Sequence, residues 1–254
     1  MINFTPGEVA RIELDNGPLN LVTGAMMERL DAVLEEIARD PAARAAVVTG
    51  AGTRAFCAGS DVKEFEGLAG RVAQGKLLYE KYVYRKLAEL PVPTIAAIEG
   101  DALGGGLELA LCCDLRVASE RARLGMPEVR LGVIPGSGGT QRLPAVIGPA
   151  RAKELILVGE LIDAQRAEQI GLVNAVVPAG GALAAAVEMG EKIAQRGPVA
   201  VREAKRLIDA SMDLDIDAGL SAEIDASERI FASEDMLEGA AAFFGKRDPE
   251  YRGR

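Results

Sequence analysis

The chain has 254 residues, 49% of them hydrophobic, and a net charge of -9 from 29 basic and 38 acidic residues. Its length and apolar content predict a folded protein with a sizeable core and exclude a largely disordered chain. The acidic excess disfavours a broad nucleic-acid surface, so we expect no nucleic-acid partner.

The residue types absent from the chain limit its chemistry. There is no histidine, so proton transfer near neutral pH must use carboxylates, lysines, tyrosines or thiols. The three cysteines, Cys57, Cys112 and Cys113, form no CxxC pair, which predicts buried reduced thiols and no metal site.

The first residues lack a signal-peptide pattern, and the uncharged run 170–187 is interrupted by Pro and Gly. We therefore expect a cytoplasmic protein with no membrane span.

Strand and helix patterns alternate through the first 180 residues. Val9 to Asp15 alternates apolar and polar residues and predicts a half-buried strand. Thr23 is a suitable cap for a helix that runs to about Arg39. Further buried strands are predicted at 45–49, 94–98 and 114–118. This alternation predicts an α/β core.

Beyond Gly180 only helical patterns occur, at 182–195, 198–211, 217–232 and 234–244. We therefore divide the chain into an α/β core, 1–195, and a helical C-terminal region, 196–254. That region is expected to form a separate layer or an assembly surface.

Two loops precede candidate site residues. After the 45–49 strand, the small residues Ala58, Gly59 and Ser60 leave backbone amides open, with Lys63 nearby. Such a loop also fits an ordinary strand-to-helix turn. Three glycines, 104–106, precede an apolar helix over 107–113, and the first turn of a helix offers unpaired N–H groups to an oxyanion.

Glu108 is the only ionisable residue of that apolar helix. Burial of its carboxylate would be costly unless it is paired or functional, and would raise its pKa. The alternative is a structural glutamate that favours the helix N-terminus or pairs with an arginine. Glu128, after Pro127, fits a helix start on local grounds.

Three short motifs point to other classes of protein, and each lacks a required residue. The glycines at 136–139 do not fit a dinucleotide loop, because Gln141 occupies the third glycine position. Residues 70–76 match GxxxxGK, but Leu77 replaces the required Ser or Thr. Residues 213–217 imitate a calcium loop, but Ala218 occupies the glycine position.

Taken in order, six segments resemble the enoyl-CoA hydratase/isomerase (crotonase) superfamily, most closely its hydratases. They are Gly17–Asn20, Ala58–Lys63, Gly104–Glu108, Pro127–Glu128, Leu131–Gly136 and Phe244–Pro249. The resemblance implies an α/β fold, a spiral of β-β-α units with a helical C-terminal trimerisation region. It also implies a homotrimer or a dimer of trimers.

The resemblance implies that the backbone N–H groups of Ser60 and Gly105 bind the thioester oxygen of an acyl-CoA. Glu108 is expected to hold and activate water, Glu128 to supply the proton at Cα, and the Gly136 N–H to contact the water. The family usually has Ala at the position of Ser60, but the N–H is retained.

The substrate is expected to be carried as a coenzyme A thioester, with no permanently bound cofactor. The resemblance implies adenine contacts from the carbonyls of Ala58, Ser60 and Val62, and phosphate contacts from Lys246, with Lys63 adding local positive charge.

Two other functions remain open. A Δ3,Δ2-enoyl-CoA isomerase needs chiefly one carboxylate, so the presence of both glutamates favours a hydratase. A weakly catalytic acyl-CoA- or RNA-binding member is disfavoured by both glutamates and by the acidic balance. The acyl specificity is not evident, although the pocket wall is expected to include the 65–84 region.

Overall fold

Two sheets organise the chain in the computed structural model, which describes residues 1–254. The larger sheet has six strands in the order β1-β2-β3-β5-β7-β10. β1 and β2 pair antiparallel, and the other neighbours pair parallel. The strands are β1 (Ile2–Thr5), β2 (Val9–Leu14), β3 (Ala45–Gly50), β5 (Thr94–Ile98), β7 (Leu115–Ser119) and β10 (Ala175–Val177).

The second sheet has four short strands in the order β4-β6-β8-β9. They are β4 (Ala55–Cys57), β6 (Asp101–Leu103), β8 (Arg123–Gly125) and β9 (Ile162–Asp163). The pairs β3/β4, β5/β6 and β7/β8 each place one strand in the large sheet and the next in the small one, and helical segments follow. This arrangement confirms the predicted spiral of β-β-α units.

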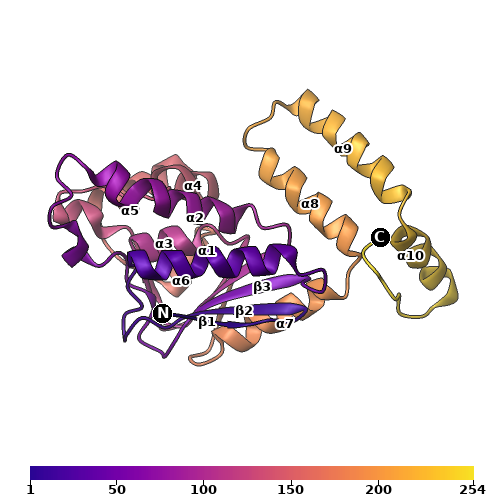
Figure 1. The fold of residues 1–254 in the computed structure, drawn as a ribbon, viewed down its shortest axis with the longest axis horizontal. Coiled ribbons are helices and arrows are strands. Elements are labelled where there is room, and N and C mark those ends of the chain that lie inside the picture. The colour runs from indigo at the N-terminus through magenta and orange to yellow at the C-terminus, as the bar shows by residue number, and fades with distance from the viewer.

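Helices cover both faces of the large sheet (Figure 1). α7 packs against β3, β5 and β7 on one face, while α1 and α2 lie on the other. The helical segments of the core are α1 (Gly24–Arg39), η1 (Val62–Phe65), η2 (Ala73–Leu77), α2 (Leu78–Ala88), α3 (Gly105–Ala110), η3 (Pro127–Leu131), α4 (Gly139–Ile147), α5 (Pro149–Val158), α6 (Ala164–Gln169) and α7 (Ala182–Ala194).

Two apolar clusters on opposite faces explain why the central strands are continuous apolar runs. In β3, Ala46 and Val48 belong to the main core, whereas Val47 belongs to a smaller cluster with Ala186 of α7. Both faces are covered, so hydrophobic residues occupy consecutive positions, 45–48, instead of alternating with polar ones.

The predicted long elements are confirmed, with ends shifted by a few residues. Thr23 caps α1, its side chain accepting from the Met26 amide. The apolar helix after the three glycines begins at Gly105 and ends at Ala110, earlier than the predicted 107–113. Strands β4, β6, β8 and β9 were not predicted, because two or three residues are too few to show periodicity.

The C-terminal helices project from the body as an arm (Figure 1). They are α8 (Pro198–Ala210), α9 (Ile216–Phe231) and α10 (Glu234–Gly245). Asp215 caps α9 by accepting from the Ala218 amide, so the calcium-like sequence is a helix start. The division at 195/196 stays a prediction. No helix is both long and apolar enough to cross a membrane.

Candidate active site

Three loops meet where the small sheet ends. β4, β6 and β8 are parallel neighbours, so their carboxyl ends lie along one edge. The segments that follow them are 58–62, 104–108 and 126–128. Consecutive turns of the spiral thus bring together candidate residues that are far apart in sequence.

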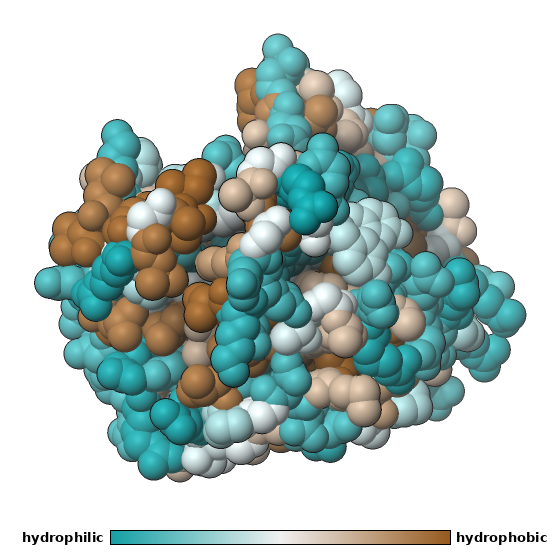
Figure 2. Space-filling view, turned by 60° about the vertical axis from the view of Figure 1, so that its left-hand side comes forward, coloured by the Kyte–Doolittle hydropathy of each residue, from teal (hydrophilic) through white to brown (hydrophobic).

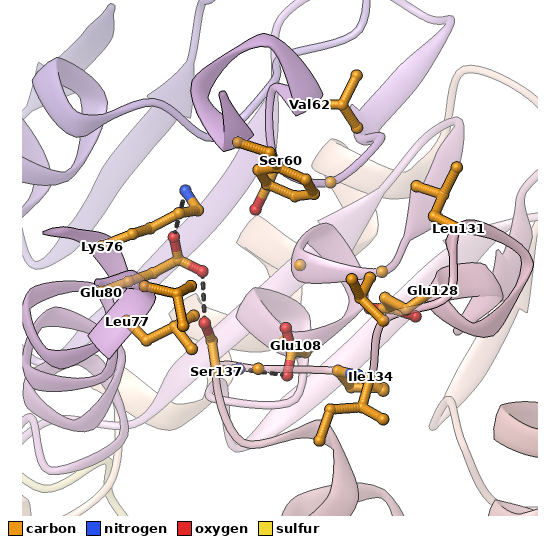
Figure 3. Close-up of a pocket in the computed structure, with 18 of the residues that line it drawn as sticks. Ser60, Val62, Lys76, Leu77, Glu80, Glu108, Glu128, Leu131, Ile134 and Ser137 are labelled. Atoms are coloured by element: carbon orange, nitrogen blue, oxygen red, sulfur yellow. Dashed lines mark hydrogen bonds and ion pairs between the residues drawn. The ribbon is translucent and has the colours of Figure 1, made fainter. Parts of the chain in front are cut away.

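These loops surround a cavity of about 1040 Å³. Figure 2 shows hydrophobic residues gathered around a hollowed part of one face, with mostly hydrophilic surface around them. The apolar lining includes Val62, Phe65, Leu68, Val72, Leu77, Leu131, Val133 and Ile134. The cavity also contains polar groups from several elements (Figure 3), namely Ser60, Lys76, Glu80, Glu108, Glu128 and Ser137. It includes part of the 65–84 region, as predicted for the pocket wall.

Glu108 is buried, at 3% exposure, in a helix whose residues are all buried. Its Oε1 accepts hydrogen bonds from the backbone amides of Ser137 and Gly139, both at 2.7 Å. Burial raises the pKa of Glu108, and the two amide bonds oppose that rise. Backbone amides of Ser137 and Gly139, next to the start of α4, therefore stabilise this carboxylate. Glu108 forms no ion pair with an arginine.

Glu128 lies in a different environment. Both of its carboxylate oxygens are buried and have no hydrogen-bond partner. Burial raises the pKa of Glu128 to about 7, and the nearby negative charge of Glu108 adds to the rise. Two of the carboxylates that line the cavity thus differ: hydrogen bonds stabilise Glu108 as an anion, whereas Glu128 retains its proton more readily.

The backbone amides of Ser60 and Gly105 lie close together. A Cβ built on Gly105 would lie 3.5 Å from the Ser60 nitrogen. Ser60 lies opposite Val22 in an isolated parallel bridge. In that bridge the Val22 amide donates to the Gly59 carbonyl and the Asp61 amide donates to the Val22 carbonyl, so the Ser60 amide takes no part in it. The Gly105 amide lies in the first turn of α3, where N–H groups lack helical partners.

Each of the three glycines meets a different neighbour. Gly104 has a φ of +51°, and a Cβ there would lie 2.9 Å from Oε1 of Glu128. A Cβ on Gly106 would come within 1.9 Å of the Cys57 carbonyl oxygen. The absence of a side chain at Gly104 therefore leaves room for the Glu128 carboxylate, and at Gly105 it leaves space beside the Ser60 amide. At Gly106 it lets α3 pack closely against β4.

Most of the predicted site residues line the cavity: Ala58, Ser60, Val62, Gly105, Glu108, Glu128 and Gly136. Lys63 and Lys246 are not among its lining residues, and Lys246 caps α10 in the arm. No cluster of three or more Cys, Asp or Glu side chains is suited to hold a metal.

Four residues at the site were not predicted from the sequence, namely Lys76, Glu80, Ser137 and Gly139. A signal for Glu80 existed, because it precedes Val83, Tyr84 and Leu87 by three, four and seven residues. That spacing places Glu80 on the buried stripe of α2. Lys76 and Glu80 are also four residues apart, and such a Lys-Glu spacing is typical of an ion pair on an exposed helix surface, so it gave no indication of a site.

A model of the family described as enoyl-CoA hydratase/isomerase matches residues 5–254. The short-chain-enoyl-CoA hydratase of Clostridium acetobutylicum is 40% identical over 245 residues, 96% of this chain and 94% of that protein. The crotonyl-CoA hydratase of Syntrophomonas wolfei is 40% identical over 226 residues, 89% of this chain and 86% of that protein. The crystal structure of enoyl-CoA hydratase from Bacillus anthracis superposes with a TM-score of 0.95 at 43% identity, covering 100% of this chain and 99% of that one.

Proposed function

The chain belongs to the enoyl-CoA hydratase/isomerase family, and we propose that it adds water across the double bond of a trans-2-enoyl-CoA to give a 3-hydroxyacyl-CoA. The observation that carries this function is the pair of buried carboxylates in one cavity, Glu108 bonded to two amides and Glu128 bonded to none. Relatives named as short-chain-enoyl-CoA and crotonyl-CoA hydratases support the same reaction.

The two carboxylates have complementary roles. Glu108 accepts a proton from water as the water oxygen bonds to Cβ of the enoyl group. Glu128, whose pKa of about 7 keeps it protonated far more often near neutral pH than an ordinary glutamate, delivers a proton to Cα. The Gly136 amide contacts the attacking water. After the addition Glu108 carries one proton more and Glu128 one fewer, and proton exchange with solvent water, which takes the proton from Glu108 and returns one to Glu128, restores both for the next turnover.

The amides of Ser60 and Gly105 stabilise the negative charge that develops on the thioester oxygen. Their proximity supports this role. Loss of one such donor typically lowers the rate by about 10²–10³.

Coenzyme A binds beside this pair of amides. The carbonyls of Ala58, Ser60 and Val62 contact the adenine, which is supported by the position of these residues at the cavity. Lys63 and Lys246 supply positive charge to the phosphates. Lys246 lies on the arm and does not line the cavity of its own chain. It contacts the CoA phosphates only where the packing of the arms in the assembly brings it to a cavity.

The assembled form is a homotrimer or a dimer of trimers in the cytoplasm. Its support is the apolar surface of the arm, where Ile216, Ile224, Phe243 and Phe244 are 64% to 83% exposed. Large exposed apolar side chains gathered on one part of a protein surface mark association surfaces.

The decisive assay mixes purified protein with crotonyl-CoA and follows loss of the conjugated enoyl-thioester absorbance. We expect the absorbance to fall as 3-hydroxybutyryl-CoA forms. A protein that hydrates no short, medium or aromatic enoyl-CoA would contradict the proposal. Turnover of a 3-enoyl-CoA without hydration would favour the isomerase. Tight RNA retention that weakens with salt would favour the RNA-binding alternative.

A further inference from the structure

One face of the helix formed by η2 and α2 reaches three separate parts of the active site. Lys76, Glu80 and Tyr84 occur at intervals of four residues, so their side chains lie on the same side. Glu80 is 3% exposed and Tyr84 is fully buried. Buried polar groups require partners, and each of these three has one in the site.

Glu80 contacts the residue that holds Glu108. The Ser137 hydroxyl donates a hydrogen bond to Oε1 of Glu80, and the Ser137 backbone amide donates to Oε1 of Glu108 at 2.7 Å (Figure 3). Ser137 is 1% exposed. A single buried residue therefore bonds both carboxylates, and its hydroxyl contact fixes where its amide points.

Tyr84 and Lys76 extend this arrangement in two directions. The Tyr84 hydroxyl donates to the Gly105 carbonyl at 2.8 Å, which orients the residue whose amide faces the thioester oxygen. Lys76 Nζ lies 2.8 Å from Oε2 of Glu80 and 3.7 Å from Oε2 of Glu64. Glu64 belongs to η1, directly after the Ser60 loop.

We propose that Lys76, Glu80 and Tyr84 are positioning residues that hold Glu108 and the paired amides of Ser60 and Gly105 at a fixed separation, with Glu80 acting through Ser137. This inference rests on the proposed hydration. Water addition at Cβ and charge development on the thioester oxygen occur in one step on one substrate, so both groups must be in place together. A displacement of about 1 Å can cost up to about 10²-fold in rate.

The first test compares kcat and KM for crotonyl-CoA in Ser137→Ala, Glu80→Gln and Glu80→Leu. Ser137→Ala keeps the backbone amide and loses only the hydroxyl, so we expect kcat to fall about tenfold with KM changed less than about twofold. Glu80→Leu, which has no acceptor for the hydroxyl, should show a similar loss. Glu80→Gln retains an acceptor oxygen and should keep at least about a third of the wild-type kcat.

The double variant Glu80→Leu/Ser137→Ala tests whether the two residues act through one contact. If they do, it should be no slower than the slower single variant, because both substitutions remove the same hydrogen bond. Tyr84→Phe acts on the other half of the site, so its loss should multiply with that of Ser137→Ala. Glu89→Gln, an exposed carboxylate at the end of the same helix, is the matched control and should leave both parameters unchanged.

Three results would overturn the inference: a kcat within about twofold of wild type in both Ser137→Ala and Glu80→Leu, multiplied losses in their double variant, or a raised KM at unchanged kcat. Ser137→Ala removes only one hydroxyl group, so this variant is expected to fold even if Glu80→Leu does not. Circular dichroism checks the folding of both variants. If the wild type itself hydrates no enoyl-CoA, the proposed function fails together with the inference. An active wild type with unaffected variants removes only the inference.

Discussion

At the scale of residues, environment separates two chemically identical side chains. Glu108 receives two backbone hydrogen bonds at the start of α4, and Glu128 receives none in a buried position. Hydrogen bonds to a carboxylate favour its ionised form, and burial without them favours the neutral acid. The difference follows from which backbone amides point at each group.

Replacing either carboxylate should stop hydration while leaving substrate binding intact. We expect Glu108→Gln and Glu128→Gln each to lower kcat by about 10²–10⁴, because each amide keeps the shape of the carboxyl group but transfers no proton. Steady-state kinetics and calorimetric binding of a CoA thioester measure the two effects. A variant that hydrates at a near-wild-type rate would refute the role of that glutamate.

The raised pKa of Glu128 predicts a pH-dependent stability. A glutamate in an unfolded chain has a pKa of about 4.3, whereas burial raises that of Glu128 to about 7. Between these values the folded state holds a proton that the unfolded state releases, so this contribution is present at low pH and is lost as pH rises through about 7.

Glu128→Gln stays neutral at every pH and supplies the reference. The Tm of the wild type minus that of Glu128→Gln should therefore fall as pH rises from about 5 to about 8. Thermal unfolding followed by circular dichroism measures it. A constant difference across this range would show that Glu128 is not buried as described.

At the scale of elements, a buried ion pair joins the arm to the body. Lys205 of α8, with a side chain 7% exposed, pairs with Asp114 and Asp209. It also donates to the Ala88 carbonyl at 3.0 Å. The other oxygen of Asp114 accepts from the amide and hydroxyl of Thr94 at 2.7 and 3.0 Å. The start of β7, the end of α2 and the arm therefore meet at one ammonium group.

Removing that ammonium group should destabilise the protein. We expect Lys205→Met to lower the free energy of unfolding by about 3 kcal/mol, because it leaves the Asp114 carboxylate without its cation. Lys192→Met, in the exposed pair with Glu188, is the matched control and should cost less than about 1 kcal/mol. Urea unfolding measures both, and equal losses would contradict the anchoring role of Lys205.

At the scale of the whole molecule, the arm exposes an apolar stripe along α9. Ile216, Leu220, Ile224 and Phe231 recur at intervals of four, four and seven residues and are 50% to 75% exposed. On a helix this spacing forms one continuous face. Such a face is costly in water and is expected to be covered by another copy of the chain.

A charge on this stripe should break the assembly. We expect Ile224→Glu to convert the oligomer into a smaller species, because an unpaired carboxylate would be buried in the interface. Ser221→Glu, which places the same charge on the polar side of α9, should leave the mass unchanged. Light scattering measures both, and a wild type that is an active monomer would contradict the assembly proposal.

The sequence alone predicted α1, the strands β2, β3, β5 and β7 and the helices α7 to α10, and its motif order indicated the family, but it gave no helix at α2 or α5. The residues of β2 and α1 show the period of a strand and of a helix, and the central strands are apolar runs. Glu108 stands out because a carboxylate in an apolar helix is unusual. Glu128 had no such local signal, and its role was inferred from the resemblance.

Only the tertiary structure decided which groups meet in the site. The short strands β4, β6 and β8 carry too few residues for a pattern, yet their parallel pairing brings the three site loops to one edge. The bonds from Ser137 to Glu80 and Glu108 join residues 57 and 29 positions apart. Contacts between such distant segments depend on how the spiral closes, which local periodicity does not encode.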